Sequence, residues 1–194
     1  EEQKFPEMDA YTVSKIFQDW KALGNVPDET VITKNTVLEV FDRLMLAMDN
    51  ARVPVNGRIL YVTNEVKYIL KEAEKLVRNI NVEDANKTIT RGVDRIDEVE
   101  IVAVPAPLMK SKYNFSNGWK PAISADQINM FLVHPSAVIT PVSYSFSQLD
   151  QPSAGSEGKY IYFEESFEDA FILNKKAGAI QYNVTASAVT TTTG

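Results

Sequence analysis

Apolar residues recur at helical spacing in two stretches near the start of the chain. The first predicts a helix that stops at Gly24, with the apolar stripe Val13, Ile16, Phe17, Trp20 and Leu23. The second predicts a helix that runs to about Ala51, with the stripe Val37, Phe41, Leu44, Met45 and Met48. Thr36 and Glu39 have the spacing of a capping box, in which each side chain accepts a hydrogen bond from a backbone N–H at the helix start.

The stretch GRILYVTNEVKYILK (57–71) predicts a strand at 58–62 that runs directly into a helix over 64–80, with Thr63 as its cap. Many nucleotide-binding sites begin with a strand followed by a helix. This stretch lacks the G-x-G-x-x-G pattern that lets backbone approach a pyrophosphate, and Glu65 would repel phosphate at the helix start. We therefore interpret the stretch as a packing unit.

Short strands dominate the middle of the chain. Residues 88–104 predict two strands joined by a tight turn at Asp97-Glu98. Another short buried strand is predicted at 130–133, where His134-Pro135 follows it. Helices and strands alternate too irregularly for a doubly wound parallel sheet, so we predict an α+β protein.

The last third of the chain also predicts strands. Residues 150–158 (DQPSAGSEG) have the composition of a loop tip. The strand-rich stretch 160–174 follows, then a turn at KKAG (175–178) and a final strand AIQYNV (179–184). This order predicts a long hairpin at the end of the chain.

The segment 108–125 is the least regular part of the sequence and mixes cations with aromatic rings. Its notable residues are Lys110, Lys112, Tyr113, Phe115, Trp119 and Lys120. Such a mixture binds single-stranded nucleic acid by stacking and phosphate contact. It is equally typical of an ordered loop with an aromatic anchor, or of a subunit contact. The net negative charge of the chain favours these two interpretations over nucleic-acid binding.

Composition is that of an ordinary folded protein of one or two domains. The chain has 194 residues, of which 44% are hydrophobic and 24% are charged, and its formal net charge is −6. This charge argues against a strongly basic nucleic-acid-binding face. The chain has no cysteine, which excludes disulfides, thiol nucleophiles and cysteine metal sites. Its longest apolar runs are far shorter than a membrane span, so we expect no membrane contact.

Candidate catalytic residues are few. His134 is the single histidine, and it cannot form a multi-histidine metal site. Four carboxylates cluster near the end of the chain, at Glu164, Glu165, Glu168 and Asp169. An alternative hypothesis is a small acidic hydrolase or transferase that uses His134 with Glu164, Glu168 or Asp169. It requires a pocket that brings these side chains together.

Six stretches, taken in order, resemble a known family. They are PEMDAYTVSKI (6–16), ITKNTVLEVFDRLMLAMDNARVP (32–54), GRILYVTNEVKYILK (57–71), ITRGVDRIDEVEIVAVPAPLM (89–109), NMFLVHPSAV (129–138) and FEDAFILNKKAGAI (167–180). Their order and spacing resemble the major capsid proteins of tailed bacteriophages and prophages that have the Hong Kong 97-type fold. The similarity spans most of the chain, although no single stretch is a sharp signature.

The resemblance implies an α+β capsid fold with two domains. A peripheral domain would contain a long spine helix and a long β-hairpin, and a compact axial domain would contain a mixed sheet with flanking helices. Residues 1–56 would begin the peripheral domain with the spine helix, 57–140 would form the axial domain, and 141–184 would return into the peripheral domain. We expect 185–194 to be a frayed tail.

The family also has an N-terminal arm and an extended loop before the spine helix. Residues 1–31 are too short to hold both, so we expect the chain to lack this upstream region.

The function implied by the resemblance is that of a structural virion protein rather than an enzyme. Its partners would be copies of itself in pentamers and hexamers of an icosahedral shell, with scaffolding and portal proteins, and packaged DNA touched only by weak non-specific contact. It would be made in the bacterial cytoplasm and located in the capsid. We expect no catalytic, cofactor-binding or metal-binding residues. The intersubunit surfaces would include 108–125, 150–158 and the strand edges after 160.

Overall fold

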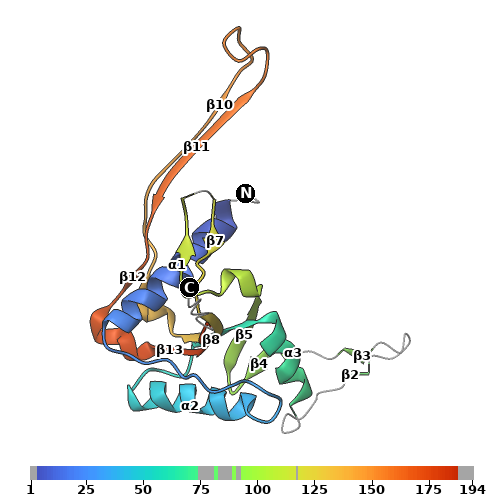
Figure 1. Cartoon of the computed structure of the whole chain (residues 1–194), viewed down its shortest axis with the longest axis vertical. Coiled ribbons are helices and arrows are strands. Elements are labelled where there is room, and N and C mark those ends of the chain that lie inside the picture. The colour runs from blue at the N-terminus through green and yellow to red at the C-terminus, as the bar shows by residue number, and fades with distance from the viewer. Residues whose placement is uncertain (1–3, 74–80, 83–88, 91–92, 117, 188–194) are drawn as a thin grey trace, which may run out of the picture.

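The protein is an α+β chain whose elements build one central sheet and one long projecting hairpin (Figure 1). The computed structural model describes residues 4–73, 81–82, 89–90, 93–116 and 118–187. The helices are α1 (Lys4–Ala22), α2 (Val37–Asn50) and α3 (Asn64–Glu72), with 3-10 turns η1 (Ala106–Leu108), η2 (Pro135–Ala137) and η3 (Asn174–Ala179). The strands are β1 (Ile59–Thr63), β2 (Asn81–Val82), β3 (Ile89–Thr90), β4 (Arg95–Ile96), β5 (Val99–Val104), β6 (Tyr113–Asn114), β7 (Lys120–Pro121), β8 (Gln127–Val133), β9 (Val138–Ile139), β10 (Val142–Asp150), β11 (Ile161–Glu168), β12 (Phe171–Ile172) and β13 (Ile180–Thr185).

The central sheet is mixed and has the strand order β13-β8-β1-β5-β4. β1 pairs in parallel with β5 and antiparallel with β8. β13 pairs antiparallel with the other side of β8, with Ile180 opposite Val133. A strand near the end of the chain therefore completes the sheet that β1, β5 and β8 begin.

Alternation along the sheet strands separates two hydrophobic cores. Leu60 and Val62 of β1 belong to the core that contains the buried stripes of α2 and α3. Phe131 and Val133 of β8 belong to the core on the other face, with the buried residues of α1 and β13. One face of the sheet is thus covered by α2 and α3, and part of the other by α1.

Aromatic rings form the centre of the α1 core. Tyr182 is fully buried and stacks on Phe131 with ring centroids 4.7 Å apart. Phe17 and Trp20 of α1 meet Tyr182 edge-on at 5.0 and 5.1 Å. The Trp20 indole also donates a hydrogen bond to the carbonyl of Ala177 at 3.2 Å. These contacts fix α1 over β13 and β8 and use most of the apolar stripe predicted for this helix.

The helix starts differ in how well they follow the predicted caps. Thr63 caps α3 as predicted, because its hydroxyl accepts a hydrogen bond from the N–H of Val66 at 3.3 Å. The capping box at Thr36 is wrong: Thr36 has helical backbone angles, and its hydroxyl donates to the carbonyl of Val31 at 2.7 Å. Glu39 pairs with Arg43 at 2.9 Å instead.

The third helix is shorter than the sequence predicts. It ends at Glu72, because Ala73 has an extended backbone with ψ of 124° and is buried against the core. The rest of the predicted helix, from 74 to 80, lies outside the described residues. The turn at Asp97-Glu98 is confirmed: both residues have positive φ, as the tight turn between two antiparallel strands requires.

One prediction for the long strands is wrong. The stretch after 160 does not pair with the final strand, since β11 pairs with β10 and β13 pairs with β8. The physical reason is burial: β13 is mostly buried and forms one edge of the central sheet, whereas β10 is exposed throughout. α2 lies across the central sheet, at the opposite end of the molecule from the long hairpin (Figure 1).

The predicted tail also has some order. Thr185 is the last residue of β13, and the N–H of Ser187 donates to Asp126 at 3.0 Å. Residues 188–194 lie outside the described part of the chain. Within the described residues, no helix combines the length and the apolar character needed to cross a membrane.

Candidate assembly interface

The β10–β11 hairpin is the most exposed ordered element of the described chain. Its register places Tyr144 opposite Phe167, with a bulge after Val142. Every residue of β10 is exposed, and so are most residues of β11. The hairpin runs away from the body along the long axis of the molecule (Figure 1).

Directly opposed residues lie on the same face of an antiparallel pair, so the register defines two faces. We call one the aromatic face, and it consists of Tyr144, Phe146, Gln148, Asp150, Ile161, Phe163, Glu165 and Phe167. The other is the serine face, which consists of Ser145, Ser147, Leu149, Tyr162, Glu164 and Ser166. Rings on the aromatic face contact one another, with centroids 5.7 Å apart for Tyr144 and Phe167 and 6.1 Å for Phe146 and Phe163.

The aromatic face has no cover. Phe163 is 51% exposed and Phe167 is 59% exposed, although both are large apolar side chains. An isolated two-stranded hairpin is at best marginally stable in water. Contiguous apolar surface of this kind marks an interaction site in soluble proteins. The hairpin is therefore a candidate interaction site.

The serine face turns toward α1 at its lower end. Lys4 of α1 forms an ion pair with Glu164, and the Tyr162 hydroxyl donates to Glu164 at 3.1 Å. The hydrogen bond from Lys4 is the main reason that the pKa of Glu164 is lowered. At the base, Asp169 accepts hydrogen bonds from the N–H of Ala170 at 2.7 Å and from the Tyr11 hydroxyl at 2.9 Å, and these lower its pKa. The contacts orient the hairpin and leave the aromatic face outward.

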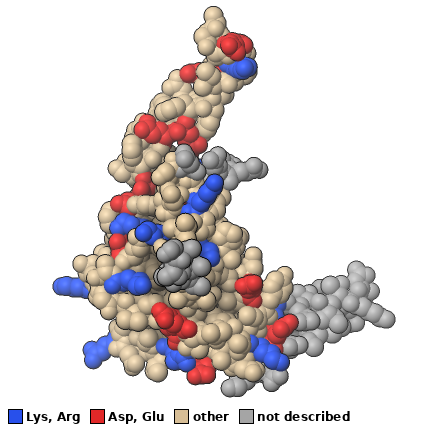
Figure 2. Space-filling view, in the orientation of Figure 1, with Lys and Arg blue, Asp and Glu red and all other residues tan. Residues whose placement is uncertain are grey.

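Charge on the hairpin is mostly negative. Residues 142–168 contain five carboxylates and a single lysine, Lys159. Figure 2 shows acidic side chains along the hairpin and positive charge near its tip. Exposed charges on free strand edges also discourage indiscriminate pairing with other strands. The hairpin thus combines exposed apolar side chains with negative charge.

The segment 108–125, which we call the lysine loop, is described at 108–116 and 118–125, and aromatic residues order these two parts. The hydroxyl of Tyr113 donates to the carbonyl of Pro107 at 2.6 Å and accepts from the N–H of Lys110 at 3.0 Å. Its ring contacts Phe115 and Trp119, each at 6.0 Å. Burial raises the pKa of Tyr113 to about 12. Tyr113 is thus an anchor within the loop. For this residue, the structure favours the interpretation of an ordered loop with an aromatic anchor over that of a ring that stacks on nucleic-acid bases.

No protein-family model matches the chain. A search of curated proteins also finds no match.

The residues of the alternative catalytic hypothesis do not meet. The Nδ1 atom of His134 bonds to Ser136, at 2.9 Å to the hydroxyl and 3.2 Å to the N–H. His134 forms no hydrogen bond or ion pair with Glu164, Glu168 or Asp169, which belong to the hairpin and its base. These contacts lie just after the end of β8, where Pro135 stops the strand. In the described ranges, no cluster of three or more acidic or histidine side chains could hold a metal ion.

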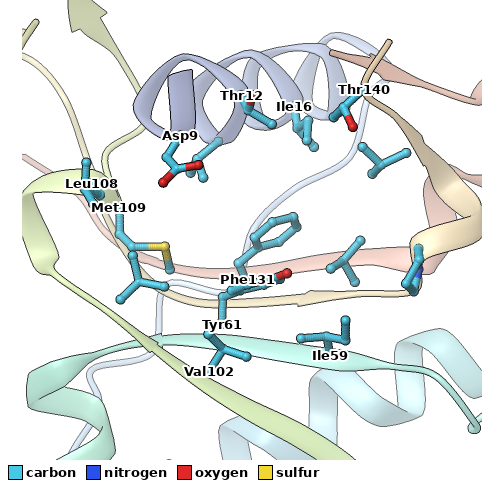
Figure 3. A pocket seen from close by; sticks show the side chains of 15 residues that line it. Asp9, Thr12, Ile16, Ile59, Tyr61, Val102, Leu108, Met109, Phe131 and Thr140 are labelled. Atoms are coloured by element: carbon cyan, nitrogen blue, oxygen red, sulfur yellow. The ribbon is translucent and has the colours of Figure 1, made fainter. Parts of the chain in front are cut away.

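A groove of about 490 Å³ lies between α1 and the central sheet, on the face of the sheet that α1 covers only in part. Figure 3 shows its walls, with Asp9 and Ile16 on α1 facing Tyr61 and Phe131 on the sheet. Its lining is mostly apolar, and the titratable side chains in it are Asp9 and Tyr61. Burial raises the pKa of each of these two groups. A histidine or a second carboxylate, either of which could complete an acid–base pair with Asp9, is not among the lining residues.

Sequence reasoning found β11 but missed the aromatic residues of β10. A signal was present, because apolar Val142, Tyr144 and Phe146 alternate with serines across 142–147. It also missed Arg58, which is buried and carries no apolar signature. The Arg58 guanidinium donates to Asp49 and to the carbonyl of Val53, each at 2.6 Å, and to that of Pro54 at 3.0 Å.

Proposed function

We propose that this protein is a structural subunit that assembles with copies of itself into a closed shell. The single observation that carries this proposal is the β10–β11 hairpin, which projects from the body with an uncovered aromatic face. A subunit that buries such an element against a neighbour gains stabilisation from its apolar area. His134 bonds to Ser136 rather than to Glu164, Glu168 or Asp169. This arrangement favours a structural subunit over the alternative hydrolase or transferase.

We further propose that the shell is the icosahedral head of a tailed bacteriophage or prophage, in which this chain is the major capsid subunit with a Hong Kong 97-type fold. The six ordered stretches of resemblance support this finer proposal. In it, α2 corresponds to the spine helix, residues 57–140 to the axial domain and β10–β11 to the long hairpin of the peripheral domain. The position of α2 across the central sheet does not add to this support.

The proposal includes the partners and location that the resemblance implies. Copies of the chain would associate as pentamers and hexamers, assisted by scaffolding and portal proteins, and would touch packaged DNA only weakly. The chain would be made in the bacterial cytoplasm and reside in the virion. The many modest interfaces of a shell would each be reversible enough to correct errors of assembly.

The test is to purify the chain and follow its association by light scattering and electron microscopy, with and without a co-expressed scaffolding protein. We expect rings or shells whose abundance rises with protein concentration. Particles that remain monomeric at high concentration in both preparations would contradict the proposal.

A further inference from the structure

The proposed self-assembly leaves open which surface of a neighbour receives the hairpin. The distal half of the hairpin, 149–163, extends beyond the other described elements of its own chain (Figure 1). Its aromatic face therefore has to be covered by another molecule. That molecule must offer apolar contact to Phe163 and positive charge to Asp150 and Glu165, which flank the rings on the same face.

The lysine loop offers both properties. Residues 108–125 contain Lys110, Lys112 and Lys120 and no carboxylate. None of these three lysines has an ion-pair partner among the described residues, whereas Lys4, Lys15 and Lys67 do. Apolar surface lies beside this charge, because Ile123 is fully exposed and Phe115 is partly exposed.

The lysine loop is also preformed, which lowers the entropy cost of binding. Ser111 fixes one end, since its N–H donates to the carbonyl of Asp126 at 3.0 Å and its hydroxyl accepts from the N–H of Asp126 at 2.8 Å. The loop also contacts α1, where Gln18 donates to the carbonyl of Ser111 at 3.2 Å. Its exposed cations are thus presented from a fixed frame.

A symmetric contact between two hairpins is disfavoured by charge. Two aromatic faces in contact would place Asp150 and Glu165 of one copy against an equally acidic surface of the other, and like charges directly opposite are destabilising. A hairpin on a lysine loop pairs opposite charges and joins two different patches. Such a head-to-tail contact closes into rings when the rotation between copies allows it.

We infer that the aromatic face of the hairpin docks on the lysine loop of a neighbouring copy of the same chain. This inference rests on the proposed function and specifies its contact. The hairpin supplies apolar area and carboxylates, and the loop supplies exposed Ile123 and the three lysines.

The absence of native cysteine permits a direct test by mixed disulfides. One variant carries Gln148→Cys on the aromatic face, and a second, extended by a mass tag, carries Ile123→Cys on the lysine loop. A matched control carries Ser147→Cys, which is the adjacent residue on the serine face. Equal amounts are assembled in pairs, oxidised mildly and separated on a denaturing gel, where a disulfide between the two variants has a mass of its own.

We expect Gln148→Cys to form the mixed disulfide with Ile123→Cys on the order of tenfold faster than Ser147→Cys does. The reason is that a disulfide requires Cα atoms within about 7 Å of each other. Assembly with predominant Gln148→Cys homodimers would overturn the inference and favour contact between hairpins. Assembly with no disulfide from either residue would also overturn it, while the proposed function would stand. A wild-type chain that never assembles would defeat the proposed function itself.

A charge-reversal cycle provides a second readout. We expect Glu165→Lys and Lys112→Glu each to lower the assembled fraction on the order of tenfold, and the double variant to recover it, since like charges replace an attractive pair in each single variant. No change in assembly for either single variant would overturn the inference. If Lys112→Glu instead abolished oligonucleotide binding at low salt and left assembly intact, the loop would serve nucleic acid and the inference would fail.

Discussion

The central sheet and the projecting hairpin use aromatic residues on β-strands in opposite ways. In the sheet, Phe131 is 5% exposed and Tyr182 is fully buried, because α1 covers the face on which their rings lie. On the hairpin, Phe163 and Phe167 are more than half exposed. The residue types are the same, and the difference is the presence of a helix and of further strands beside them.

This difference separates two roles for apolar area. In the sheet it stabilises the fold of a single chain, and on the hairpin it remains available to a neighbour. Substitutions in the sheet should therefore lower the free energy of unfolding. Equivalent substitutions on the hairpin should leave this quantity almost unchanged and act on association alone.

The largest effect is expected for Trp20→Ala in the core under α1. The substitution removes a buried ring that contacts Phe17 and Tyr182, and it removes the hydrogen bond that the indole N–H donates to the carbonyl of Ala177. We expect a loss of about 3–5 kcal/mol in the free energy of unfolding, measured by denaturant titration. The matched hairpin substitution, Phe167→Ala, should change it by less than about 0.5 kcal/mol. Equal losses in both variants would contradict the separation of roles.

A smaller effect is expected for Arg58→Met, which tests a polar contribution to the sheet region. Arg58 is buried and bonds to Asp49 and to two backbone carbonyls between α2 and β1. Because these carbonyls lose their donor, we expect a loss of about 2–3 kcal/mol in the same titration. The exposed Arg95→Met is the control, with an expected change within about 0.5 kcal/mol. An equal, small change in both would show that Arg58 is dispensable.

Acid should weaken the body of the molecule through Asp28, which fixes the segment before α2 to β13. Burial opposes ionisation of Asp28, but hydrogen bonds from Thr30, Asn183 and Arg43 outweigh it and lower its pKa. A lowered folded-state pKa stabilises the fold above the unfolded value of about 4, and this contribution is lost as pH falls through the folded-state pKa.

We therefore expect the free energy of unfolding to fall below about pH 4, and to fall less steeply in Asp28→Asn, in denaturant titrations at a series of pH values. The exposed Asp97→Asn serves as the control. Identical pH profiles for the wild type and Asp28→Asn would count against this role of Asp28.

The smallest effect is expected for Tyr182→Phe. The Tyr182 hydroxyl is buried and has no hydrogen-bond partner in the described part of the chain. Its removal should change the free energy of unfolding by no more than about 1 kcal/mol and toward greater stability, because an unpaired buried polar group is costly. A clear loss in thermal and denaturant unfolding would show that the hydroxyl has a partner.

Local signals in the sequence predicted local structure well. The apolar spacing of Phe17 and Trp20 gave the buried side of α1, and Thr63 gave the cap of α3. These features depend on residues within a few positions of one another, which is why spacing and side-chain chemistry suffice to predict them.

Pairing between distant strands could not be predicted in the same way. Nothing near Ile180 indicates that it lies opposite Val133, because the choice depends on which sheet edge remains open after β1, β5 and β8 have paired. The same limit affected the candidate interface. Residues 150–158 were predicted as a loop tip, but the alternation of Val142, Tyr144 and Phe146 with serines does not specify that this stretch pairs with β11.

The most direct test of the central claim compares the wild type with a triple variant, Tyr144→Ser, Phe163→Ser and Phe167→Ser, by sedimentation velocity at matched concentrations. Denaturant unfolding of both proteins, diluted until the wild type is monomeric, reports the stability of the body, because association would itself stabilise the folded state. We predict that the wild type sediments as assemblies, and that the triple variant sediments as a monomer with an unchanged unfolding midpoint. Assemblies of equal size and abundance in both proteins, or a triple variant whose body unfolds at a much lower denaturant concentration, would contradict the account.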